Sequence, residues 1–271
     1  MKDFMITSYD KKISVDDFNP DDTLNLDKKD AKAETLLLKE RFRALQEMLY
    51  ASKKYALLIV LQGMDCSGKD GAVNNALSEI NPSGFSVKAF KVPTPEELSH
   101  DYLWRIHQQT PGKGEITVFN RSYYEDVLVT RVHGQIDDKT ARDRFEEIRN
   151  FEKYLRNNHT IILKFFLHIS KEFQKEQLLE RLEEPEKNWK FSENDLKERE
   201  LWEQYQLCYS DVLSRCSSSH APWYVVPSNH RWVRDYFILT AIVKTLEKLD
   251  LEYPEIQGNE QKLIDAVKAS E

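Results

Sequence analysis

The chain has 271 residues, of which 40% are hydrophobic, and its formal net charge is −7. This length and hydrophobic content are enough for one α/β domain with a core that needs neither disulfides nor metal ions. The negative net charge argues against nonspecific nucleic-acid binding. No apolar stretch approaches the roughly 20 residues of a membrane span, and Met1–Phe4 does not begin a signal peptide, so we expect a cytoplasmic protein with no membrane contact.

The first part of the chain leads up to one apolar strand. Residues 1–30 have no sustained hydrophobic period, which predicts an extended arm that packs on a neighbour or stays mobile. Residues 31–53 place their apolar side chains on one helical face, which predicts an amphipathic helix in the core or at an interface. The apolar run 57–61 then predicts a buried strand.

A glycine-bounded loop ending in Gly-Lys follows this strand and leads into a helix-compatible segment at 69–80. A strand, such a loop and a helix form a phosphate cradle, in which backbone N–H groups and the helix N-terminus face anionic oxygens. Lys69 adds a mobile positive charge. The predicted phosphate-binding residues are Gly63, Ser67, Gly68, Lys69, Asp70 and Gly71.

Two acids in this loop predict a divalent cation. Asp70 stands where most such loops place Ser or Thr, and Asp65 lies inside the loop. Carboxylates facing a polyanion would repel it unless a cation such as Mg²⁺ lies between them, and Asp65 is the preferred ligand. The alternative for Asp70 is a helix N-terminal acid that stabilises the helix dipole by about 0.3–1 kcal/mol.

The three cysteines, Cys66, Cys208 and Cys216, form no Cys-x-x-Cys pair and are odd in number. Neither a disulfide framework nor a zinc site follows from them, so we interpret them as reduced thiols. Cys66 lies in the phosphate loop beside a helix start, where a thiol pKa can fall; the alternative is a small filler residue.

Further along the chain, strands alternate with helices. This spacing predicts parallel β-α-β units, a single three-layer α/β domain over residues 1–271, and ligands at the carboxyl ends of the strands. The predicted elements are a turn at 81–84, a strand at 85–90, a helix at 95–109, strands at 115–120, 160–167 and 223–226, helices at 140–157 and 232–246, and a loosely attached tail at 251–271.

One connection is unusually long and highly charged. It separates the strand at 160–167 from the strand at 223–226 and contains two helical stretches interrupted at Pro185. Such a segment is typical of a mobile lid, which we place at about 171–200. The alternative is a surface helical hairpin with solvated salt bridges, because Glu residues are interleaved throughout.

Several motifs in order give the chain a resemblance to the family-2 polyphosphate kinases over residues 35–240. They are Met64-Asp65-Cys66-Ser67-Gly68-Lys69-Asp70-Gly71, Phe90-Lys91-Val92-Pro93, His100-Asp101-Tyr102-Leu103-Trp104-Arg105, Asn120-Arg121-Ser122-Tyr123-Tyr124-Glu125-Asp126, Trp189-Lys190-Phe191-Ser192 and Ala221-Pro222-Trp223-Tyr224-Val225-Val226-Pro227. The resemblance implies a P-loop kinase fold and reversible, Mg²⁺-dependent phosphoryl transfer between inorganic polyphosphate and a nucleotide.

The resemblance also implies roles for particular residues. Lys69 and Asp65 match the family's phosphate-loop lysine and metal-binding aspartate, Arg121 matches the arginine after the third strand, and Arg181 matches a lid arginine. Asn120 departs from members that carry Asp at this position, which puts the usual second metal ligand in doubt.

The residues after Arg121 resemble the subgroup that accepts both nucleoside mono- and diphosphates. In that subgroup Asp126 takes over the second metal role, and Glu125 stands where diphosphate-specific members have Asn. We therefore expect Asp65 and Asp126 to be the metal ligands and Glu125 to be a determinant of the nucleotide site.

Phosphoryl transfer needs alignment and charge neutralisation more than covalent help. We expect Lys69 and the loop to hold the acceptor's phosphates, Arg121 and Arg181 to stabilise the group in transfer, and no general base to be required. The candidate polyphosphate-binding residues are Lys88, Lys91, Arg105, Lys113, Arg131, Lys175 and Lys187.

Two other functions stay open on the sequence alone. The first is an ATP-dependent nucleoside or nucleotide kinase on the same scaffold, and the second is a nucleotide-binding regulatory module without kinase activity. The sequence has no Asn-Lys-x-Asp guanine-recognition motif, which disfavours a switch protein. The amphipathic helix at 31–53 would suit the interface of a homo-oligomer.

Overall fold

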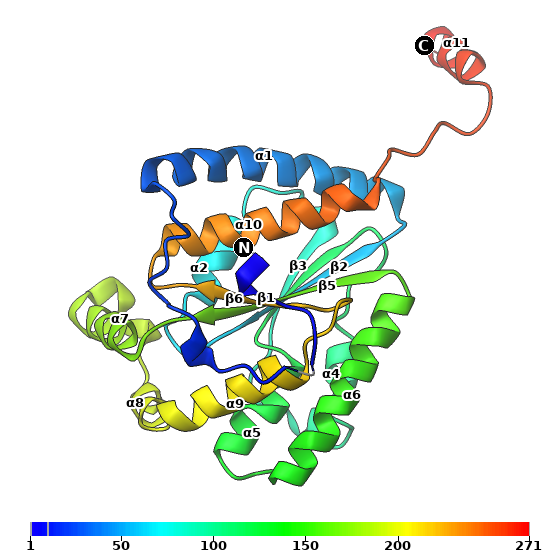
Figure 1. Cartoon of the computed structure of the whole chain (residues 1–271). Helices are drawn as coiled ribbons and strands as arrows, with labels where there is room; N and C mark the ends of the chain where they lie inside the picture. The colour runs from blue at the N-terminus through cyan, green and yellow to red at the C-terminus, as the bar shows by residue number, and fades with distance from the viewer. Residues whose placement is uncertain (1, 10, 271) are drawn as a thin grey trace.

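A computed structural model of the chain describes residues 2–9 and 11–270. Within them lies a six-stranded sheet with the order β1-β6-β5-β2-β4-β3, in which β1 is antiparallel and the other strands are parallel (Figure 1). The strands are β1 (Met5–Ile6), β2 (Ala56–Gln62), β3 (Phe85–Ala89), β4 (Ile116–Asn120), β5 (Thr160–His168) and β6 (Trp223–Pro227). This confirms the predicted α/β fold.

The central strands β2 and β5 are buried along their whole length. Side chains alternate across a strand, so Leu57 and Ile59 enter the core on one face of the sheet while Leu58 and Val60 enter the core on the other. Because both faces are covered, the sequence shows continuous apolar runs there.

Helices cover both faces of the sheet, giving the predicted three layers (Figure 1). On one face α10 packs against α2 and β6, and α1 lies across α10. These helices are α1 (Lys28–Ser52), α2 (Lys69–Ala76) and α10 (Arg231–Leu246). The opposite face carries α4 (Trp104–His107), α5 (Val129–Val132), α6 (Asp138–Asn157) and α9 (Trp202–Arg215).

The amphipathic helix expected at 31–53 is α1. Its side chains Phe42, Leu45 and Leu49 are buried, with exposed fractions of 0%, 3% and 0%. They belong to the same core as α10, so this face of α1 is core rather than an interface between chains.

Two helix predictions were wrong in extent. The helix expected at 95–109 is two short helices, α3 (Pro95–Leu98) and α4, because the Asp101 carboxylate accepts the backbone N–H of Leu103 and begins a new turn. The helix expected at 69–80 ends at Ala76, four residues early.

The N-terminal residues fold onto their own chain. β1 pairs with β6 at the edge of the sheet, and Ile6, Ile13 and Val15 are buried. The backbone N–H of Ile13 donates to Ser214 Oγ at 2.8 Å. The expectation that this arm packs on a neighbour or stays mobile therefore does not describe residues 5–9 and 11–15, because the apolar side chains among them complete the chain's own core. Met1 and Asp10 lie outside the described residues.

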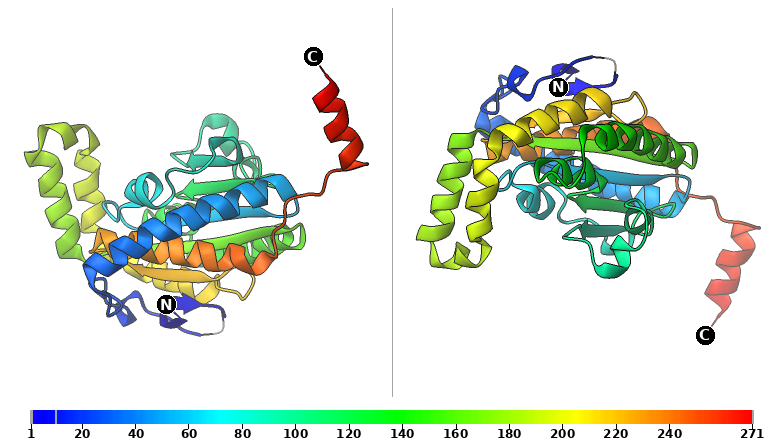
Figure 2. Two further views of the ribbon diagram at one scale, coloured as in Figure 1. Left: turned by 90° about the horizontal axis from the view of Figure 1, so that it is seen from above. Right: turned by 90° about the horizontal axis from the view of Figure 1, so that it is seen from below.

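Two parts of the chain stand apart from the sheet. Residues 171–200 form α7 (Lys171–Glu183), η5 (Pro185–Lys190) and α8 (Glu193–Glu200), which project at one side of the body (Figure 2). After the short turn η6 (Glu247–Leu249), an extended stretch leads to the exposed helix α11 (Glu260–Ala269) on the opposite side. None of the described helices is both long and apolar enough to cross a bilayer.

Candidate active site

The phosphate loop connects β2 to α2 at the carboxyl edge of the sheet. Its backbone takes left-handed conformations at Cys66, with φ of 69°, and at Gly68, with φ of 88°. A side chain at Gly68 would overlap Nη1 of Arg234, which donates to the Gly68 carbonyl at 3.1 Å. Glycine is thus required here both for its conformation and for the close approach of an arginine.

Lys69 begins α2 and turns back over the loop. Its Nζ donates to the carbonyl oxygens of Gly63 at 2.7 Å and Met64 at 3.1 Å. Burial, followed by the nearby charge of Arg121, lowers the pKa of Lys69 to about 8. An anion bound at the loop would raise the pKa of Lys69 back toward its ordinary value. Binding of a phosphate and protonation of Lys69 therefore favour each other.

Arg121 lies between two carboxylates. Its guanidinium is 2.6 Å from Asp65 Oδ1 and 3.3 Å from Glu125 Oε2. The other Glu125 oxygen accepts from Gln62 Nε2 at 2.8 Å. Burial acts to raise the pKa of Asp65, but the charges of Lys69 and Arg121, with a smaller one from Arg181, outweigh it and lower the pKa. Asp65 is therefore an ionised carboxylate at neutral pH.

Asp126 lies in the turn η4 (Tyr123–Val127) that follows β4. Burial raises its pKa to about 6, against the lowering effect of Arg105 and Arg144. Its Oδ2 is 3.9 Å from Arg105 and is buried without a hydrogen-bond partner. A buried carboxylate oxygen that lacks a donor is suited to a cation.

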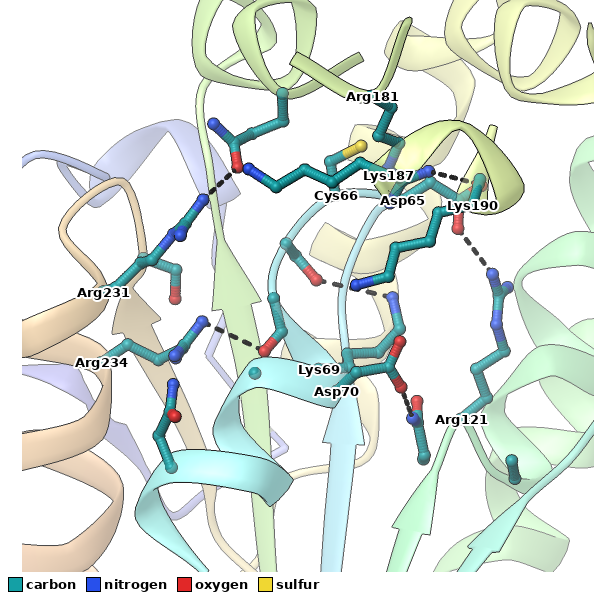
Figure 3. A pocket seen from close by; sticks show the side chains of 18 of the residues that line it. Asp65, Cys66, Lys69, Asp70, Arg121, Arg181, Lys187, Lys190, Arg231 and Arg234 are labelled. Atoms are coloured by element: carbon teal, nitrogen blue, oxygen red, sulfur yellow. Dashed lines mark hydrogen bonds and ion pairs between the residues drawn. The ribbon is translucent and has the colours of Figure 1, made fainter. Parts of the chain in front are cut away.

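A cavity of about 400 Å³, here called the basic cavity, lies between the phosphate loop, the segment 171–200 and the start of α10 (Figure 3). In Figure 3 lysines and arginines converge from these three parts of the chain, and Arg121 reaches the cavity from the end of β4. Its basic lining residues are Lys69, Lys91, Arg121, Arg181, Lys187, Lys190, Arg231 and Arg234; its acidic ones are Asp65, Asp70 and Glu180.

A second cavity of about 950 Å³, here called the mixed cavity, shares Asp65, Phe90, Lys91 and Arg121 with the basic cavity. Acids outnumber bases in its lining: Asp65, Glu97, Asp101, Glu125, Asp126 and Glu198 against Lys91, Arg105, Arg121 and Arg144. Its apolar and aromatic lining residues are Phe90, Val92, Pro93, Leu98, Tyr102, Val129, Ile136 and Tyr205.

Two cations of the segment 171–200 that line the basic cavity, Arg181 and Lys187, are paired within the protein. Arg181 donates to Asp195 Oδ2 at 3.0 Å and to the Lys190 carbonyl at 3.2 Å. Lys187 forms ion pairs with Glu180 and Glu184. A phosphate in the basic cavity would compete with these acids for the same side chains.

The structure brings most of the predicted site residues together. The basic cavity is lined by Asp65, Ser67, Gly68, Lys69, Asp70, Gly71, Lys91, Arg121, Arg181 and Lys187; the mixed cavity by Arg105, Glu125 and Asp126; and Gly63 lines a small cavity beside them. The Asp70 carboxylate accepts from Asn120 Nδ2 at 2.6 Å, which holds the loop to the end of β4.

Four predicted polyphosphate contacts lie outside both cavities. Lys113 precedes β4 and so lies at the opposite edge of the sheet, and Arg131 is paired with Asp138 and Asp211. Lys88 on β3 and Lys175 on α7 are not among the lining residues of either cavity.

Other site residues were missed. Lys190, Arg231 and Arg234 line the basic cavity, and Tyr102 and Arg144 line the mixed cavity. Tyr102 and Lys190 stand inside quoted motifs but were given no role, and Arg144, Arg231 and Arg234 belong to none of those motifs. The guanidinium of Arg144 lies over the Tyr102 ring, 4.7 Å from its centroid.

Comparison with known proteins agrees with the site. A family profile described as Polyphosphate kinase 2 (PPK2) matches residues 25–254. The chain belongs to the polyphosphate kinase 2 family. This confirms the family and the class of enzyme, a polyphosphate-dependent nucleotide kinase, predicted from the motifs.

Individual relatives cover nearly the whole chain. An AMP/ADP-polyphosphate phosphotransferase from Meiothermus ruber is 46% identical over 257 residues, spanning 94% of this chain and 96% of that protein. An ADP-polyphosphate phosphotransferase from Rhodopseudomonas palustris is 45% identical and spans 80% of this chain and 79% of its own. The crystal structure of polyphosphate kinase 2 from Arthrobacter aurescens TC1 superposes with a TM-score of 0.92 at 37% identity, covering 98% of both chains.

Proposed function

We propose that this chain transfers phosphoryl groups reversibly between inorganic polyphosphate and both AMP and ADP. The relatives that the chain resembles over most of its length carry these substrates in their names. The observation that carries the proposal is the pair of cavities that meet at Asp65 and Arg121, one strongly basic and one partly apolar and acidic.

The charge balance favours polyphosphate in the basic cavity. Eight basic side chains face three acidic ones there, which suits a flexible polyanion better than the balance in the mixed cavity does. The phosphate loop and Lys69 would then hold the donor. This allocation differs from the sequence-based expectation that they hold the acceptor's phosphates.

The mixed cavity suits the nucleotide. Tyr102 and the neighbouring apolar side chains offer a surface for a base, while Arg105 and Arg144 offer charge for phosphates. The acceptor phosphate would enter beside Asp126 and Glu125. Glu125 would thereby contribute to the choice between mono- and diphosphates, as the sequence predicts.

Asp65, which lines both cavities, and Asp126, which lines the mixed cavity, would fit Mg²⁺. No set of three or more His, Cys, Asp or Glu side chains in the described part of the chain is arranged to hold a metal. Mg²⁺ commonly takes only one or two carboxylates plus substrate phosphates and waters, so Asp65 and the unpartnered Asp126 oxygen suffice. The bound ion would neutralise charge between the two polyanions.

The protein's own groups would perform the alignment. Arg121, held by Asp65 and Glu125, lies where the cavities meet and would stabilise the group in transfer. Arg181 would reach it from the segment 171–200, which we propose acts as a lid. An acceptor phosphate oxygen is already ionised at neutral pH, so no general base is required.

An assay with AMP, ADP, GMP and GDP against polyphosphate, with and without Mg²⁺, tests the proposal. We expect AMP and ADP to be phosphorylated only with the metal present. ATP-dependent phosphorylation without use of polyphosphate would support the nucleotide-kinase alternative, and nucleotide binding without turnover would support a regulatory module. The cytoplasmic location and the homo-oligomeric state remain predictions.

A further inference from the structure

A closed network of polar side chains lies beneath the turn η4. The Glu152 Oε1 atom accepts hydrogen bonds from the hydroxyls of both Tyr123 and Tyr124, each at 2.8 Å. Lys164 Nζ donates to Glu152 Oε2 at 2.8 Å and to the Tyr124 hydroxyl at 2.9 Å. All four residues have exposed fractions of 0%.

The network is complete and is an unusual feature of a core. The third N–H of Lys164 donates to the Cys216 carbonyl at 2.6 Å, so every proton of the ammonium group has an acceptor. Lys164 interrupts the apolar run of β5, a central strand where the neighbouring side chains are hydrophobic. A buried ion pair is weak evidence for stability, because hydrophobic replacements are often neutral or stabilising. A role other than stabilising the fold accounts better for the presence of this ion pair in the core.

The position of the network indicates that role. Tyr123 and Tyr124 immediately precede Glu125 and Asp126 in the sequence, and all four lie in η4. The two hydroxyls converge on one carboxylate oxygen, which fixes both rings and with them the backbone of the turn. Glu125 and Asp126 extend from the same turn into the mixed cavity.

We propose that Glu152, whose charge Lys164 balances, is a positioning residue that holds Glu125 and Asp126 in place through the two tyrosine hydroxyls. The inference rests on the proposed function for its kinetic consequences. Removing a residue that orients a metal ligand typically lowers metal affinity or activity 10- to 100-fold. We expect a loss of activity of about that size here. Neither Glu152 nor Lys164 touches a substrate cavity.

Two neutral double variants separate positioning from stability. Glu152→Gln/Lys164→Met removes both charges but keeps an amide oxygen that accepts the tyrosine hydroxyls. Glu152→Leu/Lys164→Met also removes the charges but leaves the hydroxyls without an acceptor. We expect the first variant to keep most of the wild-type kcat, and the second to lose about 10- to 100-fold while unfolding cooperatively.

Tyr124→Phe and Tyr224→Phe form a matched pair of single variants. Both tyrosines are buried. The Tyr124 ring packs on Trp223 and its hydroxyl belongs to the network, whereas Tyr224 lies in the other core, where its ring stacks on Phe165. We expect Tyr124→Phe to raise the Mg²⁺ concentration needed for half-maximal rate. Tyr224→Phe should leave that concentration unchanged.

A measurement without substrates or metal gives an independent test. In metal-free protein, amide hydrogen exchange over residues 122–128 should accelerate in Tyr124→Phe and in Glu152→Leu/Lys164→Met, but not in Glu152→Gln/Lys164→Met. Equal exchange and equal kcat in the two double variants would overturn the inference. If the wild-type protein itself shows no transfer, the proposed function fails, and the exchange data still test the positioning role.

Discussion

Replacing Asp126 by asparagine should make the metal-free protein more stable at neutral pH while it abolishes most activity. The Asp126 carboxylate is buried, its pKa is raised to about 6, and its Oδ2 has no hydrogen-bond partner. An acid whose pKa is higher in the folded state binds its proton more tightly there than in the unfolded chain. Ionising Asp126 therefore costs stability, and asparagine removes that cost.

The magnitude follows from the displacement of the pKa. A rise from 3.8 to about 6 corresponds to about 3 kcal/mol at pH 7, since a tenfold change in an equilibrium constant is about 1.4 kcal/mol. At pH 5 the wild-type carboxyl is mostly protonated in the folded state, so the advantage of the variant falls to about half. At pH 4 about 0.6 kcal/mol of the advantage is left, and it disappears below about pH 3, where the carboxyl is protonated in the unfolded chain as well.

Denaturant unfolding of wild type and Asp126→Asn at pH 7 and pH 5, with a chelator present, measures this difference. Asp65→Asn is the matched control, because the pKa of Asp65 is lowered and its ionised form is stabilised by ion pairs. That variant should lose stability at pH 7 and lose less as the pH falls below 3.8. A less stable Asp126→Asn, or a gain that does not depend on pH, would refute the reasoning.

Three further outcomes follow from the site. Lys69→Met should lower kcat by at least about 100-fold with cooperative unfolding retained, and near-normal turnover would remove Lys69 from the mechanism. Arg181→Ala should slow transfer with little change in Tm, because the segment 171–200 contributes little to the core; a large drop in Tm would mark a structural residue. Gly68→Ala should lose activity as well as about 1–2 kcal/mol of stability, because its side chain meets Arg234, whereas Gly134→Ala, with φ of 64° but open space around it, should lose stability alone.

Local patterns predicted the fold well. The apolar runs at 57–61 and 160–167 became β2 and β5 because strands buried on both faces need apolar side chains throughout. The prediction of one helix at 95–109 was wrong because side-chain hydrogen bonds to backbone N–H groups compete with helical hydrogen bonds. The bond from the Leu103 N–H to Asp101 is an example. A hydrophobic period averaged over a window of residues does not detect such a break in a helix.

Candidate site residues within one sequence motif were predicted, whereas residues that only the folded chain brings together were missed. Asp65 and Lys69 were predicted from the spacing of one loop, and both line the basic cavity. Arg234 meets that loop across 166 positions of sequence, and only the packing of α10 on α2 brings them together. Lys113 was assigned on charge alone, although its place before β4 puts it at the wrong edge of the sheet.

The division of donor and acceptor between the two cavities is tested most directly by the kinetics of Arg231→Gln, with polyphosphate as sole phosphoryl donor, ADP as acceptor and Mg²⁺ present. Arg231 lines only the basic cavity. The account predicts that wild type forms ATP and that the variant has a higher KM for polyphosphate with an unchanged KM for ADP. Absence of ATP formation, or a higher KM for ADP alone, would contradict it.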